Sequence, residues 1–137
     1  MTRTLLLLLA LAATLLSSAF AQEHTPRQVA EDAMRHRALA QAQDIAAACF
    51  ASGKGKEACM TVMREQCVGL AVGKFCGLRE EASADPQKSF QITAKANRDA
   101  AQCMESGKAY EDCLWDLQTA CHGLGIGKFC GMVHSHS

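Results

Sequence analysis

The sequence has few aromatic residues and no excess of charge of either sign. Its 137 residues include one Trp, one Tyr and five Phe, and 14 Lys and Arg balance 14 Asp and Glu. A chain without a basic excess lacks the charge footprint of proteins that bind nucleic acid or anionic membranes. A small domain with so few aromatic side chains also has a marginal apolar core, so we expect additional covalent links.

Motifs of catalysis are missing as well. There is no G-x-S-x-G, no H-E-x-x-H and no C-x-x-C, the motif of thioredoxin-like proteins. Gly73-Lys74 and Gly127-Lys128 lack the spacing of a phosphate-binding loop, and each is followed by Phe rather than by Ser or Thr. We therefore expect a protein that is not an enzyme and that needs no cofactor.

The N-terminus has the features of a secretory signal peptide. Arg3 precedes an unbroken run of Leu, Ala and Thr from Leu5 to Leu16, and small residues follow at Ser18–Ala21. The run is too short to span a bilayer, which takes about 20 residues. We predict a signal peptide at 1–21 and a mature chain of 137 − 21 = 116 residues. Without a second long apolar segment, that chain is expected to be periplasmic or extracellular in a bacterium.

The eight cysteines form two sets of four with the same spacing, and the second set lies 54 residues after the first. Residues 47–78 match residues 101–132 at 15 of 32 positions, which indicates an internal duplication. An exported chain meets an oxidising compartment, and an even cysteine count there predicts disulfides. The expected disulfide residues are Cys49, Cys59, Cys67 and Cys76 in the first copy and Cys103, Cys113, Cys121 and Cys130 in the second.

The helical spacing of the cysteines limits their pairing. Cys59 and Cys67 lie eight residues apart in one predicted helix, about 12 Å along its axis. Because a disulfide needs Cα atoms within roughly 7 Å, these two cannot pair. A hairpin favours Cys49–Cys59 with Cys67–Cys76, and the same pattern in the second copy. The alternative is Cys49–Cys67 with Cys59–Cys76.

Good helix formers and the absence of alternating strand patterns predict an all-α fold. Each copy is expected to be a helical hairpin, starting at Thr25-Pro26 or Asp85-Pro86 and turning at Ser-Gly, with a short third turn at Phe75-Cys76. Met34 and Ile45 are assigned to the apolar face of the first helix. The predicted fold is two tandem disulfide-stapled hairpins in a small pseudo-symmetric bundle. Its parts are repeats at 22–79 and 87–132, a linker at 80–86 and a disordered tail at 133–137.

A second hypothesis is that the cysteines bind a metal ion. Thiolates with Met and His bind copper or zinc, and His134 and His136 form an H-x-H pair. Structural zinc sites, however, use cysteines two to four residues apart, and none are that close here. We expect no metal site, a disordered H-x-H tail, and His24 and His36 facing solvent.

The run Cys49…Ala58-Cys59…Cys67…Cys76, followed by Glu80-Glu81, resembles the N-terminal region of the LprI-type lysozyme inhibitors. The resemblance implies a small, helical, cysteine-stapled domain that binds or inhibits a protein in the periplasm. The Trp and Leu-Asn positions that follow the last cysteine in that family have no counterpart here.

From the sequence we expect an exported, non-enzymatic protein-interaction module. Its partner is expected to be another protein, such as a cell-wall hydrolase of the lysozyme type. The alternative is a periplasmic copper or zinc handling protein that uses Cys, Met and His.

Overall fold

The computed structural model describes residues 23–70, 72, 75–79 and 84–134, and this part of the chain is helical. Its helices are α2 (Pro26–Ala51), α3 (Lys56–Cys67), α4 (Pro86–Glu105) and α5 (Tyr110–Cys121), and within the described ranges no strand occurs beyond isolated β-bridges. The all-α prediction is confirmed. The predicted signal peptide and residues 80–83 of the predicted linker lie outside the described residues.

The two long helices begin at the predicted capping residues. Thr25 and Gln28 form a reciprocal capping box at the start of α2, and the Asp85 side chain accepts from the backbone N–H of Lys88 at the start of α4. Pro occupies the first turn of both helices, where its missing N–H costs nothing. Each helix ends at a Ser-Gly turn, with the glycine in the left-handed region.

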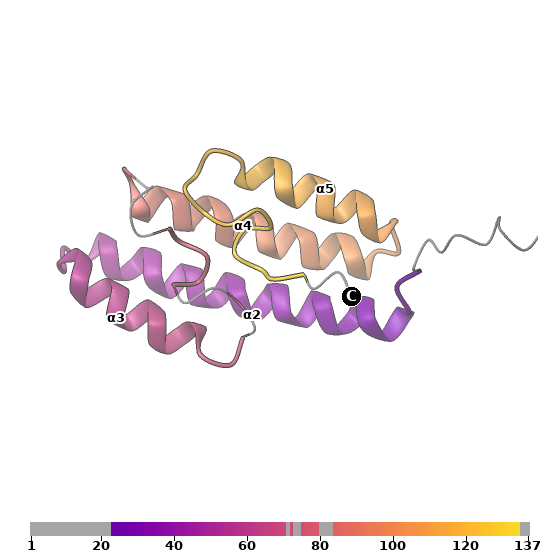
Figure 1. Cartoon of the computed structure of the whole chain (residues 1–137), viewed down its shortest axis with the longest axis horizontal. Helices are drawn as coiled ribbons and strands as arrows, with labels where there is room; N and C mark the ends of the chain where they lie inside the picture. The colour runs from indigo at the N-terminus through magenta and orange to yellow at the C-terminus, as the bar shows by residue number, and fades with distance from the viewer. Residues whose placement is uncertain (1–22, 71, 73–74, 80–83, 135–137) are drawn as a thin grey trace, which may run out of the picture.

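The helices form two antiparallel hairpins that pack side by side (Figure 1). In the middle of the bundle α2 lies against α4, while α3 and α5 lie on the outside. The hairpin pairing of the cysteines is the one present in the structure, and all eight cysteines are paired. The Cα–Cα distances are 5.6 Å for Cys49–Cys59, 5.3 Å for Cys67–Cys76, 5.7 Å for Cys103–Cys113 and 5.2 Å for Cys121–Cys130.

The buried face of α2 differs from the predicted one. Met34 is 64% exposed and Ile45 36% exposed, whereas the core contains His36 and Gln43. The prediction followed apolar residues alone, and these two polar residues are buried because they form hydrogen bonds. The Phe50 and Phe90 rings also stack between the two helices, with 6.3 Å between their centroids. Small buried residues make up much of the remaining core on α2 and α4: Ala40, Ala46, Ala47, Ala94, Ala100 and Ala101.

The glycine-rich segments after α3 and α5 pair with each other. Leu78 forms an antiparallel bridge with Ile126, and the Gly127 N–H donates to the Gly77 carbonyl over 2.9 Å. The short helical turn expected at Phe75-Cys76 is not formed, because Cys76 has a φ of 49°. This positive angle directs the Cys76 carbonyl into the protein interior, where it accepts a hydrogen bond from Gln43.

Gly77 and Gly131, which are equivalent in the two copies, face each other where these segments meet. Both have positive φ angles, 92° and 101°. A Cβ atom on Gly77 would lie 2.2 Å from the Gly131 Cα, and one on Gly131 would lie 2.6 Å from the Cys76 carbonyl oxygen. Only glycine permits this backbone contact, which explains why the Cys-Gly step is present in both copies.

Because of this contact, we expect two similar glycine substitutions to lower the free energy of unfolding by different amounts. Gly77→Ala should lower the free energy of unfolding by several kcal/mol, because the new methyl group meets backbone atoms that cannot move aside. Gly53→Ala is the matched control, since Gly53 also has a positive φ, 77°, but has open space around it. It should cost only about 1–2 kcal/mol. Urea unfolding with the disulfides intact measures both, and equal costs would contradict the proposed contact.

Candidate functional site

A pair of buried amide side chains joins the two copies. Gln43 and Asn97 occupy equivalent positions, since 43 + 54 = 97, and Asn97 Nδ2 donates to Gln43 Oε1 over 2.9 Å. Gln43 Nε2 also donates to the carbonyl oxygens of Cys76 at 3.1 Å and Cys130 at 2.7 Å. The two amide side chains therefore link α2 and α4 to the loop segments that follow α3 and α5.

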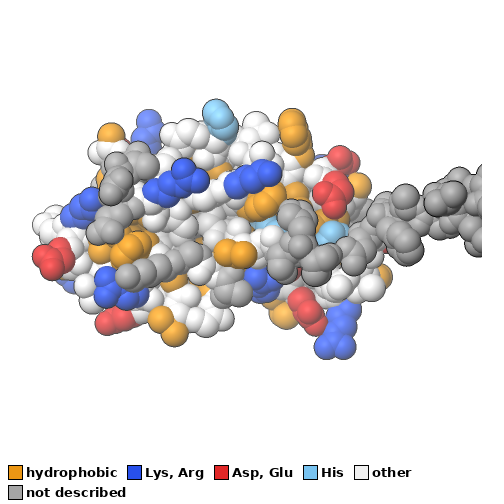
Figure 2. Space-filling view, viewed as in Figure 1, with side chains coloured by type: hydrophobic (Ala, Val, Ile, Leu, Met, Phe, Trp, Pro, Cys, Tyr) orange, Lys and Arg blue, Asp and Glu red, His pale blue; other side chains and the backbone are white. Residues whose placement is uncertain are grey.

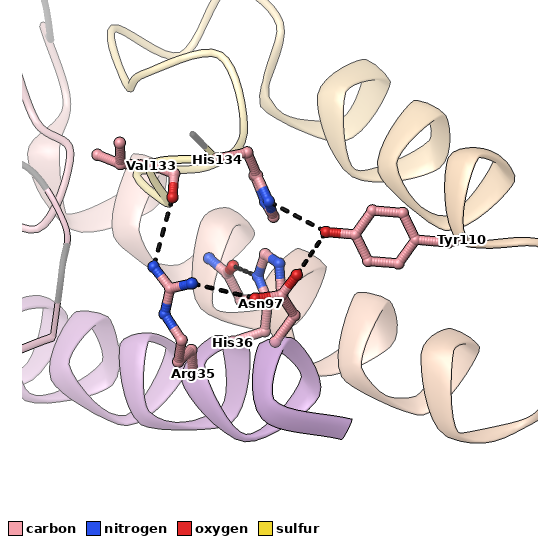
Figure 3. A network of polar contacts seen from close by, with 7 residues as sticks. Arg35, His36, Asn97, Tyr110, Val133 and His134 are labelled. Atoms are coloured by element: carbon pink, nitrogen blue, oxygen red, sulfur yellow. Dashed lines mark hydrogen bonds and ion pairs between the residues drawn. The ribbon is translucent and has the colours of Figure 1, made fainter. Parts of the chain in front are cut away.

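The network continues to His36, whose ring is fully buried (Figure 3). His36 Nδ1 lies 2.7 Å from Asn97 Oδ1. Since Asn97 uses its Nδ2 group as a donor elsewhere, its Oδ1 accepts and His36 Nδ1 carries the proton. The basic nitrogen is then Nε2, which has no hydrogen-bond partner among the described residues. Burial lowers the pKa of His36, and the hydrogen bond to Asn97 and the nearby Asp32 oppose that shift only in part. The expectation of a solvent-facing His36 is wrong.

Next to His36, Asp32 connects α2 to α5. Its Oδ2 accepts from the Tyr110 hydroxyl over 2.5 Å, and its Oδ1 accepts from Arg35 Nη1 over 3.0 Å. The Tyr110 oxygen also lies 3.2 Å from His134 Nδ1, and these contacts are visible in Figure 3. Burial, followed by the hydrogen bond to Asp32, raises the pKa of Tyr110 well above its ordinary value, so Tyr110 stays protonated and acts as a donor.

The start of the predicted tail has a defined position, which differs from the expectation of disorder. The His134 ring stacks on His36 with 5.4 Å between ring centroids and meets Phe129 edge-on at 4.8 Å. Arg35 Nη2 donates to the Val133 carbonyl over 3.4 Å. Val133 and His134, here called the C-terminal strap, thus cover the His36 end of the network. The remaining residues, 135–137, lie outside the described part of the chain.

A groove of about 950 Å³ lies beside this cluster. Helix α2 forms one wall because it begins six residues earlier than the repeat requires: the equivalent of Pro86 is residue 86 − 54 = 32, whereas α2 begins at Pro26. The α4–α5 turn forms the other wall. The lining is mainly apolar, with carboxylates and one lysine at its rim: Glu23, His24, Pro26, Val29, Ala30, Ala33, Met104, Glu105, Gly107, Lys108, Ala109, Tyr110 and Glu111. The His24 and Tyr110 rings stack at 3.9 Å within it.

The polar cluster of Asp32, His36 and Tyr110 and the groove beside it lie where the two copies differ in sequence. His36 corresponds to Phe90, which is buried and apolar, and Tyr110 corresponds to Lys56. Sequence reasoning followed the identities between the copies and so passed over these positions. The signal available in the sequence was a His opposite a Phe at positions 36 and 90, and a Lys opposite a Tyr at positions 56 and 110.

Several conspicuous side chains are distributed over the surface. Trp115 is 69% exposed on α5, and Lys54 and Lys108 are exposed at the two Ser-Gly turns. Figure 2 shows basic and acidic side chains interspersed on one face of the molecule. Within the described ranges, no three His, Cys, Asp or Glu side chains lie together as metal ligands, and no helix has the length and apolar character of a membrane span. His136 and Lys74 are outside those ranges.

In comparisons with known proteins, no family model, no curated protein and no solved structure matches the chain.

The buried network should contribute far more to stability than the ion pair beside it. Asn97→Ala leaves buried polar atoms of Gln43 and His36 without a partner and should cost about 2–4 kcal/mol. Arg98→Ala removes the half-exposed pair with Asp44 and should cost less than about 1 kcal/mol. The two positions are adjacent, and each contacts its repeat equivalent, so they are matched for location. Similar losses in thermal or urea unfolding would show that the network is not the dominant contact.

Proposed function

We propose that the mature protein is an exported, non-enzymatic module that binds another protein through the groove between α2 and the α4–α5 turn. The observation that carries the proposal is the position of the groove. It lies where the two copies differ, at the N-terminal extension of α2 and around Tyr110. A feature needed only for the bundle would be expected at both ends of a duplicated fold.

The groove has the size and lining of a binding site. Ligand pockets typically have volumes of about 300–1,000 Å³ and apolar walls with a few polar groups. Val29, Ala30 and Ala33 supply one apolar wall, and Met104 faces them from α4. The Cys103–Cys113 disulfide braces the α4–α5 turn. A braced wall loses little conformational freedom on binding, which favours affinity.

The charges at the rim favour a basic partner. Glu23, Glu105 and Glu111 line the groove together with a single cation, Lys108. Arg37 pairs with Glu105 at 2.6 Å, which leaves a small acidic excess. Complementary charge speeds association and disfavours acidic competitors. A cell-wall hydrolase with a basic surface, such as a lysozyme, fits this pattern and the resemblance to lysozyme inhibitors.

Binding and inhibition assays with a panel of purified lysozymes test this function. The disulfide-intact mature protein should bind at least one of them and slow its lysis of cell walls. Ala30→Arg places a bulky cation in the groove and should weaken binding at least about tenfold, a loss of about 1.4 kcal/mol. Ala48→Arg, on the same helix but away from the groove, is the matched control and should bind as the wild type does. Absence of binding to every lysozyme contradicts the inhibitor proposal, and unchanged binding by Ala30→Arg contradicts the groove.

The alternative function, copper or zinc handling, needs free thiols. All eight cysteines are paired in this structure. We therefore expect the native protein to have an intact mass lower than that of the reduced chain by eight hydrogens, with no cysteine open to alkylation. An unshifted mass together with bound copper or zinc would instead support the metal-handling function.

A further inference from the structure

Asp32 lies close to both Tyr110 and His36. Its Oδ2 accepts the Tyr110 O–H, and its Oδ1 is engaged by Arg35. Asp32 and His36 are four residues apart on α2, so their side chains lie on the same face of the helix. His36 Nε2, the basic nitrogen of that ring, has no hydrogen-bond partner among the described residues.

We propose that Asp32 exchanges partners in mild acid: it leaves the Tyr110 O–H, accepts a hydrogen bond from protonated His36 Nε2, and so releases Tyr110 and the C-terminal strap. No covalent bond changes except that His36 takes up one proton from solvent, while Tyr110 keeps its own. Because the Tyr110 ring lines the groove, the exchange would regulate binding there. Its biological meaning therefore rests on the proposed function, although the exchange itself does not.

The surroundings of His36 leave Asp32 as the acceptor. The groups that face the ring are Asp32 and Arg35 from α2, Asn97 from α4 and His134 from the strap. Tyr110 from α5 joins this set through its hydrogen bond to Asp32. Asp32 is the one carboxylate in this set, and Asn97 Oδ1 is already occupied by His36 Nδ1. A buried N–H on a charged ring has a high cost unless it is paired, so protonation draws Asp32 towards it. Arg35 and burial both oppose the charge, which places the event below the ordinary histidine range.

Release of Tyr110 from Asp32 would loosen the strap, because Tyr110 is a polar anchor of the strap beside the hydrogen bond from Arg35 to the Val133 carbonyl. Tyr110 contacts His134 Nδ1, and the charge on His36 would lie under the stacked His134 ring, 5.4 Å away between centroids. Tyr110 also stacks on His24 in the groove, at 3.9 Å. Movement of this one side chain therefore alters the strap and the groove together.

Hydrogen exchange of the backbone amides at 130–134, measured from pH 7.5 to pH 5 and corrected for the intrinsic rate, tests the exchange of partners. In the wild type, protection of these amides should fall at least about tenfold, with the midpoint at which the His36 ring titrates by NMR. His36→Phe, which installs the residue found at the equivalent position 90, should abolish the fall. His122→Gln is the control, because His122 is exposed and distant in sequence from the strap, and it should behave as the wild type does.

Thermal unfolding supplies a second readout. A histidine that stays neutral when folded but is protonated when unfolded makes stability fall as the pH drops through the unfolded value, about 6.5. The melting temperature of the wild type should fall by several degrees below that pH, and His36→Phe should lack this part of the fall.

Two results would overturn the proposal. One is an acid-dependent loss of strap protection that persists in His36→Phe. The other needs only the wild type, in case that variant does not fold: titration of His36 without any change in the Tyr110 and His134 resonances. Neither assay uses a binding partner, so the exchange can fail while groove binding is confirmed, and groove binding can fail while the exchange is confirmed.

Discussion

The hydrogen bond between Gln43 and Asn97 is the interaction on which the rest of the bundle depends. It joins equivalent positions of the two copies. Gln43 also donates hydrogen bonds to the carbonyl oxygens of Cys76 and Cys130 in the two loops. Buried amides are costly unless every polar atom is satisfied, so they fix one alignment of the helices. An interface of alanines alone would tolerate sliding. The amides supply the register that these small side chains cannot.

The same network explains why the two ends of the bundle differ. At one end the repeat has Phe90, which needs no partner and fills the core. At the other end the equivalent residue is His36, which is buried through its bond to Asn97 and adjoins a second polar set, Asp32 and Tyr110. A duplicated fold has thus kept its centre and changed one end, where the longer α2 also creates a groove.

Much of this architecture follows from local rules in the sequence. The helix starts at Pro26 and Pro86, the Ser-Gly turns and the cysteine pairs depend on residues close together in the chain. Capping residues predict the starts and turns, and the cysteine spacing favours the observed pairing over the alternative of Cys49–Cys67 with Cys59–Cys76. The buried face of α2 was wrongly predicted because His36 and Gln43 look like surface residues until their distant partners are known. The groove and the strap are likewise made by segments far apart in the sequence, so no periodicity signals them.

The disulfides brace each half of the molecule but do not join the halves. Each links cysteines only 9 or 10 residues apart, within a hairpin or its following loop, and contributes about 3 kcal/mol in the chain-entropy model. Association of the two halves is therefore left to noncovalent contacts, which include the amide network, the glycine contact between the loops, the Phe50–Phe90 ring stack and the ion pairs Arg37–Glu105 and Asp44–Arg98. A protonation at His36 acts on this unbraced interface, where a change of about 1 kcal/mol can shift a local equilibrium without unfolding either hairpin.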